Sequence, residues 1–127
     1  MSLARIFLVE DEAIIAEDLN QSLQRMGYEI PFISASGAEA LKKLETVKPD
    51  LVLMDVVMPN LNGFQATRAL TRDESTKHIP IILVTTKDQD TDRVWGMRQG
   101  AKAYLTKPFS EEELGAVIKQ VMGNPAG

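Results

Sequence analysis

The chain alternates between short segments that are almost wholly apolar and longer segments in which apolar residues recur every three or four positions. The short segments are typical of strands buried on both faces, and the longer ones are typical of amphipathic helices. We expect strands at Ile6–Val9, Glu29–Ser34, Leu51–Met54, Ile81–Val84 and Ala103–Leu105, each followed by a helix.

Residues with capping properties mark where several of these helices begin. Ser36 followed by Glu39, and Ser110 followed by Glu113, have the spacing of a capping box, in which each side chain satisfies a backbone amide of the other residue. Asp90 stands before a further helical pattern and is predicted to be its N-cap.

Five rounds of strand and helix predict an α/β fold with a doubly wound, five-stranded parallel sheet and helices on both faces. Parallel strands need crossover connections of about helix length, and these crossovers are right-handed. A length of 127 residues suits one domain, and the chain contains no internal repeat or linker. We place this domain at residues 4–123 and a short C-terminal tail at residues 124–127.

The composition excludes several classes of function and of site. With a formal charge of −4 and a pI near 5.0, the chain is not expected to bind nucleic acid directly. The absence of cysteine excludes disulfides and thiolate metal sites and suits a reducing interior. No apolar run approaches the ~20 residues that span a bilayer, so we expect no membrane contact and a cytoplasmic location.

Polar side chains gather where the predicted strands end, at the edge where ligands bind in open α/β sheets. They are Glu10, Asp11 and Glu12 after the first strand, Asp55 after the third, Thr85 and Thr86 after the fourth, and Thr106 and Lys107 after the fifth. If the first and third strands are neighbours, three carboxylates crowd one space and favour a hard cation such as Mg²⁺. Carboxylate, hydroxyl, lysine and Mg²⁺ together suit phosphoryl transfer to Asp55.

Four segments resemble the receiver domains of two-component response regulators, the CheY-like superfamily. They are FLVEDE at residues 7–12, LMDVVMP at 53–59, VTT at 84–86 and YLTKPF at 104–109, and they follow one another at the spacing of that family. The C-terminal half, with Phe64–Arg68, Thr85–Gln89 and Val94–Gly96, is similar to single-domain receivers of twitching-motility systems. The resemblance implies the strand order 2-1-3-4-5.

The resemblance also implies a role for each matched residue. Asp55 would be the phosphoacceptor, Lys107 would contact the phosphoryl group, and Thr85 and Tyr104 would form the switch pair. Mg²⁺ would be held by Asp11, Asp55, the Val57 backbone carbonyl and, through water, Glu10. The donor would be a sensor histidine kinase or a phosphotransfer protein. Phosphorylation would alter binding of a downstream protein through the face made by the fourth helix, the fifth strand and the fifth helix.

Two other functions compete with this interpretation. Phosphatases that form an aspartyl-phosphate usually carry a second aspartate two residues after the nucleophile, and Val57 occupies that position here. A degenerate receiver would bind partners without phosphate, although Asp11, Asp55, Thr85 and Lys107 are all present. If the chain is a phosphorylated receiver, it is a signalling switch and not an enzyme that turns over an outside substrate. The sequence leaves open whether it acts alone or within a longer protein.

Overall fold

The computed structural model describes residues 4–123, and the predicted tail at 124–127 lies outside the described residues. The elements are β1 (Arg5–Val9), α1 (Ala13–Arg25), β2 (Glu29–Ser34), α2 (Gly37–Val47), β3 (Leu51–Asp55), α3 (Gly63–Arg72), β4 (Ile81–Thr85), α4 (Asp90–Arg98), β5 (Ala103–Thr106) and α5 (Glu111–Met122). All five predicted strands are present. β3, β4 and β5 each extend one residue further than expected, so that Asp55, Thr85 and Thr106 are the last residues of their strands.

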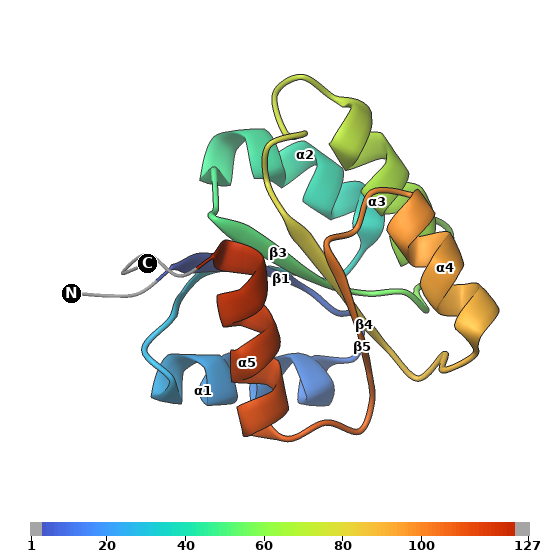
Figure 1. Cartoon of the computed structure of the whole chain (residues 1–127). Coiled ribbons are helices and arrows are strands. Elements are labelled where there is room, and N and C mark those ends of the chain that lie inside the picture. The colour runs from blue at the N-terminus through green and yellow to red at the C-terminus, as the bar shows by residue number, and fades with distance from the viewer. Residues whose placement is uncertain (1–3, 124–127) are drawn as a thin grey trace.

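The strands form one parallel sheet in the order β2-β1-β3-β4-β5, which confirms the predicted fold. Helices α1 and α5 cover one face, while α2, α3 and α4 cover the other (Figure 1). Alternate residues of each strand therefore enter two separate cores. In β3, for example, Leu51 and Leu53 pack toward α1 and α5, whereas Val52 and Met54 pack toward α2 and α3.

Two of the capping predictions are corrected by the structure. Gln89 is the N-cap of α4, and Asp90 is already the first helical residue. Ser36 does cap α2 by accepting the Glu39 amide, but the Glu39 carboxylate accepts from Ser34 and Ala35 and does not complete a box. The Glu39 carboxylate lies 2.9 Å from the hydroxyl of the buried Ser34, which is also 2.8 Å from the Ser36 carbonyl, so it helps to satisfy a buried polar group.

Two complete capping boxes are present within residues 4–123. Ser110 and Glu113 form the predicted one at α5. Asn62 and Gln65 form another at α3, with both hydrogen bonds 2.9 Å long. This second box fixes the start of α3 and therefore the loop that leads to it from Asp55.

Candidate functional site

The carboxyl ends of β1 and β3 bring three acids together. The two strands are neighbours, with Val9 paired to Met54, and the following residues include Glu10, Asp11 and Asp55. One carboxylate oxygen from each of these acids lies within 4.8 Å of the others. Glu10 and Asp55 are buried, with 2% and 7% of their surfaces exposed, while Asp11 is exposed. The sequence predicted this cluster on the condition that the first and third strands are neighbours, and the pairing of β1 with β3 meets that condition.

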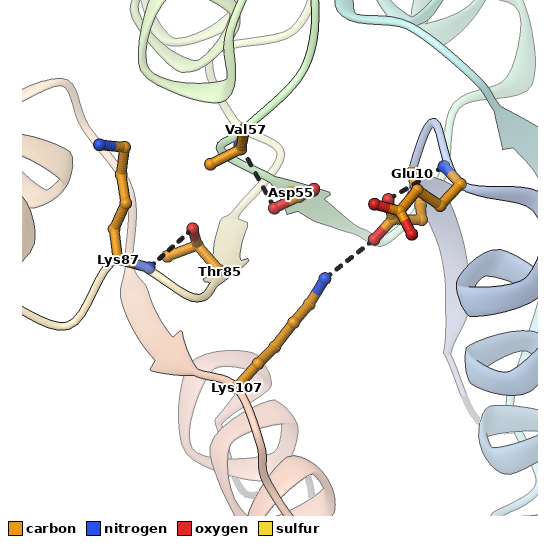
Figure 2. Close-up of polar contacts among 7 residues, drawn as sticks. Glu10, Asp55, Val57, Thr85, Lys87 and Lys107 are labelled. Atoms are coloured by element: carbon orange, nitrogen blue, oxygen red, sulfur yellow. Dashed lines mark hydrogen bonds and ion pairs between the residues drawn. The ribbon is translucent and has the colours of Figure 1, made fainter.

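Lys107 reaches the acid cluster from the end of β5, but its closest partner is Glu10 (Figure 2). The Lys107 ammonium donates to Glu10 Oε1 over 3.0 Å, and the Glu12 amide donates to Glu10 Oε2 over 3.2 Å. Both oxygens of Glu10 are therefore engaged within the chain. Asp55 Oδ1 accepts from the Val57 amide over 3.3 Å, which leaves the Asp55 carboxylate less occupied than that of Glu10.

Burial governs the protonation of both buried acids. Loss of hydration raises the pKa of Asp55, and this effect exceeds the opposing influence of the Lys107 charge. The pKa of Glu10 is also raised by burial, although the Lys107 and Glu12 hydrogen bonds oppose the rise. Two buried carboxylates with raised pKa values hold their negative charge at a cost, which a bound cation would offset.

The Asp55→Asn variant is expected to be more stable than the wild type near neutral pH. Since burial raises the folded-state pKa of Asp55, the folded protein binds a proton more readily than the unfolded chain. Stability contributed by protonated Asp55 is thus complete below the unfolded pKa of about 3.9 and is lost as the pH rises through the folded pKa. Urea midpoints of both proteins should differ at neutral pH and converge at about pH 4.

Asp73→Asn is the control, because the pKa of Asp73 is shifted in the opposite direction to that of Asp55. The backbone and side-chain hydrogen bonds of Ser75 lower the pKa of Asp73. That carboxylate contributes stability above its unfolded pKa and loses it as the pH falls, so its replacement should not stabilise the protein near pH 7. A stability gain from Asp55→Asn that is the same at both pH values would contradict the assignment of the gain to the buried charge.

The loop after β4 connects two further predicted residues. Thr85 is fully buried, and its hydroxyl accepts the Lys87 amide over 3.2 Å. The Tyr104 hydroxyl donates to the Lys87 carbonyl over 2.8 Å. Lys87 therefore joins Thr85 to Tyr104 through its backbone, a role that its exposed, charged side chain did not indicate in the sequence.

A groove of about 400 Å³ opens beside the residues that follow Asp55. Val57, Phe64, Lys87 and Trp95 are among the residues that line it. Val57 and Trp95 expose about half of their surfaces, 53% and 50%. The predicted site thus has an apolar border on its α4 side.

A larger hollow, of about 560 Å³, lies at the other end of the sheet, next to the residues that precede β3 and β4. His78, the single histidine, lines it. Three of the polar side chains that line this hollow have partners in the chain: Ser75 Oγ donates to Glu45, and Asp50 Oδ2 accepts the Arg5 amide. The convergent acids and the lysine lie at the opposite edge, and this is where we place the chemistry.

Comparison with known proteins agrees with this geometry. The family model of the response regulator receiver domain matches residues 6–119. The chain belongs to this family. The receiver is 49% identical over 120 residues to protein PilH of Pseudomonas aeruginosa, an alignment that covers 94% of the chain and 98% of PilH. This bears out the expected similarity to single-domain twitching-motility receivers.

Longer regulators and solved structures are also similar to the receiver. It is 40% identical to the transcriptional regulatory protein PhoP of Bacillus subtilis, over 93% of the receiver and 48% of PhoP. A chemotaxis protein of Vibrio cholerae, CheY4, has a TM-score of 0.87 and 32% identity, covering 94% and 99% of the two chains. The receiver domain of a Pseudomonas aeruginosa sensor histidine kinase has a TM-score of 0.86 and 31% identity, covering 95% and 98%, and carries a magnesium ion in its active site cleft.

The receiver is therefore a signalling domain of the kind that acts with histidine kinases and phosphotransfer proteins. Receiver domains bind Mg²⁺ in an acidic pocket, and the three clustered carboxylates of this chain offer the hard oxygen ligands that Mg²⁺ prefers. Within residues 4–123, none of the helices is both long and apolar enough to cross a membrane.

Proposed function

We propose that this receiver accepts a phosphoryl group on Asp55, with Mg²⁺, from a sensor histidine kinase or a phosphotransfer protein. The observation that supports this most directly is the convergence of Glu10, Asp11, Asp55 and Lys107 at one edge of the sheet. Three acids and one lysine from three separate strand ends have no common structural purpose in the core, whereas phosphoryl transfer needs both a nucleophile and neutralising charge.

Each predicted residue has a defined part in this proposal. Asp11, Asp55, the Val57 carbonyl and, through water, Glu10 would hold Mg²⁺, which supplies positive charge to the phosphoryl oxygens. An Asp55 carboxylate oxygen attacks phosphorus, the bond from phosphorus to the donor histidine nitrogen breaks, and that nitrogen keeps the electron pair. Lys107 leaves Glu10 and pairs with a phosphoryl oxygen, as a point charge that needs no fixed orientation.

The phosphorylated state would be transmitted through Thr85 and Tyr104. The Thr85 hydroxyl accepts the Lys87 amide, so movement of this hydroxyl toward a phosphoryl oxygen, to which it would donate its own proton, would carry the Lys87 backbone with it. The loop at Lys87 would then shift, and the face made by α4, β5 and α5 would bind a downstream protein differently. The phosphoryl group must favour one conformer over the other for this shift to occur.

The competing functions are less well supported. Val57 supplies no acid or base beside Asp55, so turnover of an outside phosphoester lacks a proton donor. A receiver that works without phosphate does not need the buried, charged Asp55, which lowers stability.

We propose that residues 4–123 act as one receiver domain in the cytoplasm and that its partners are proteins. Incubation with a small phosphodonor such as acetyl phosphate tests the phosphoryl transfer. We expect the protein to be labelled in the presence of Mg²⁺ and the labelling to be lost when Mg²⁺ is chelated.

Val57→Asn is expected to shorten the lifetime of the phosphorylated receiver, by up to about tenfold if one hydrogen bond to the attacking water is gained. The Val57 side chain is half exposed beside Asp55 and offers water no polar partner. The decay of the phosphorylated mass after removal of the donor measures this lifetime. Val94→Asn, at a similarly exposed valine on α4, should decay like the wild type. A wild type that decays faster than Val57→Asn would contradict the role of Val57.

A further inference from the structure

The start of α2 lies directly against the loop at residues 56–62, which follows Asp55 and leads to α3. Gly37 is the first residue of α2 and is buried. A Cβ atom at position 37 would lie 2.9 Å from the Leu61 carbonyl oxygen and 3.3 Å from Leu61 Cδ2. Because non-bonded carbon atoms pack best at about 3.5–4.0 Å, this close approach of helix and loop requires a residue without a side chain.

The loop is tied together at its base and held on one side. The Gly63 amide donates to the Val56 carbonyl over 2.9 Å, and Asp55 Oδ1 accepts the Val57 amide over 3.3 Å. The Leu61 side chain is partly buried and packs against the core on the α2 and α3 face of the sheet. A short loop that is closed in this way moves as a unit, so a displacement at Leu61 also displaces Val57.

The start of α2 is itself anchored to the segment that carries Glu10. The Ser34 carbonyl, at the end of β2, accepts the Glu10 amide over 2.9 Å. The Ser34 side chain is buried, and its hydroxyl lies 2.8 Å from the Ser36 carbonyl and 2.9 Å from a Glu39 carboxylate oxygen. These contacts fix the turn that precedes Gly37, so the loop, and not the helix, must give way to an atom added there.

We propose that Gly37 is a positioning residue that gives the acid cluster its preference for Mg²⁺ over Ca²⁺, by holding the loop that carries the Val57 carbonyl. Mg²⁺ requires nearly octahedral ligands at about 2.0–2.1 Å, whereas Ca²⁺ accepts a flexible set at about 2.3–2.6 Å. A methyl group on residue 37 would move the Leu61 carbonyl by about 0.5 Å, from 2.9 Å to an ordinary contact distance. Such a shift would weaken the binding of Mg²⁺ more, because this ion has the stricter geometry. The inference rests on the proposed function in one respect, the role of the Val57 carbonyl as a ligand.

Isothermal titration calorimetry of the protein with Mg²⁺ and, separately, with Ca²⁺ tests the proposal without a phosphodonor. In Gly37→Ala the dissociation constant for Mg²⁺ should rise roughly tenfold, as for other residues that orient a metal ligand, and that for Ca²⁺ at most about twofold. Gly115→Ala is the matched control, since the nearest atom to a Cβ there is Met26 Sδ at 3.4 Å. It should change neither constant.

Leu61→Ala is a second variant, which adds no atom and removes the side chain by which the loop packs on the core. It should also weaken the binding of Mg²⁺ more than that of Ca²⁺. Its control is Leu41→Ala, at a partly buried leucine of α2 that packs against the same core. This control should leave the ratio of the two dissociation constants unchanged.

Several results would overturn the proposal. They are a wild type that binds Ca²⁺ as tightly as Mg²⁺, an unchanged ratio in Gly37→Ala, and equal changes in Gly37→Ala and Gly115→Ala. If Gly37→Ala does not fold, an unchanged ratio in Leu61→Ala would overturn it. A wild type that binds no Mg²⁺ would overturn the proposed function as well. A protein that shows the expected change in Gly37→Ala but takes up no phosphoryl group would refute the proposed phosphoryl transfer alone.

Discussion

The Asp55→Asn variant is expected to take up no phosphoryl group from a small phosphodonor, whereas the wild type gains one in the presence of Mg²⁺. Asparagine has nearly the same shape as aspartate, but its amide is a poor nucleophile and a weaker ligand for a cation. The neighbouring Glu10 has both carboxylate oxygens engaged, by the Lys107 ammonium and the Glu12 amide, so we do not expect it to replace Asp55 as the acceptor. Intact-mass spectrometry of both proteins after incubation with the donor measures the difference.

Asp88→Asn is the control for this experiment. Asp88 is an exposed aspartate in the loop between β4 and α4, outside the acid cluster, and its replacement should leave labelling intact. Unchanged labelling of Asp55→Asn would place the acceptor at another residue. If the wild type itself took up no phosphoryl group, the degenerate receiver would become the better interpretation.

Gly63→Ala is expected to slow labelling on the order of 100-fold, the cost of displacing a reacting group by about 1 Å. Gly63 begins α3 and packs on the backbone of the acceptor: a Cβ atom there would lie 2.5 Å from the Asp55 carbonyl oxygen and 2.7 Å from Val56 Cα. Backbone atoms cannot move aside as a flexible side chain does, so the strand end must shift. Overpacking of this kind also costs about 1–3 kcal/mol of stability.

The same substitution at Gly115 separates this effect from a general effect of alanine in a helix. Gly115 lies within α5, and the nearest atom to a new Cβ is Met26 Sδ at 3.4 Å, an ordinary contact. Gly115→Ala should leave the rate of labelling unchanged and stabilise the protein by about 0.5–1 kcal/mol. Initial rates of labelling and urea midpoints of both variants provide the comparison, and equal rates for the two variants would show that Gly63 does not position Asp55.

The sequence predicted the elements well because the hydrophobic pattern of this chain is simple. The wholly apolar segments around Leu53 and Leu83 are β3 and β4, the strands buried on both faces. The ends of these strands were predicted one residue too early, since Asp55 and Thr85 continue the backbone pairing of the sheet although they are polar. A polar residue at the edge of a sheet can keep its backbone pairing while its side chain turns toward the site, and hydropathy alone does not reveal this.

The gathering of the acids was predictable, while the partner of each side chain was not. Because ligands bind at the carboxyl ends of the strands, the sequence alone predicts Glu10, Asp55 and Lys107 at one edge of the sheet. That Lys107 pairs with Glu10 depends on side-chain reach across the sheet. The sequence does not predict the contact of Arg93, a residue of α4, because its guanidinium donates to a backbone carbonyl, that of Tyr104 in β5.

The α3 capping box was not predicted, although its spacing is present in the sequence. Asn62 followed by Gln65 has the required spacing, although asparagine and glutamine stand in place of the more familiar serine and glutamate. At α4, in contrast, Asp90 was predicted as the cap because its side chain is of a type that caps helices. In the structure Asp90 and Asp92 lie inside the first turn, where they interact favourably with the helix dipole.

The position of Trp95 in the groove beside Val57 gives the protein an intrinsic optical reporter. It is the only tryptophan in the chain, so the indole emission comes from a single place. That place borders both the segment that follows Asp55 and the loop that carries Lys87. Fluorescence titration of the unlabelled protein can therefore follow events at this site directly, without background from a second fluorophore of the same kind.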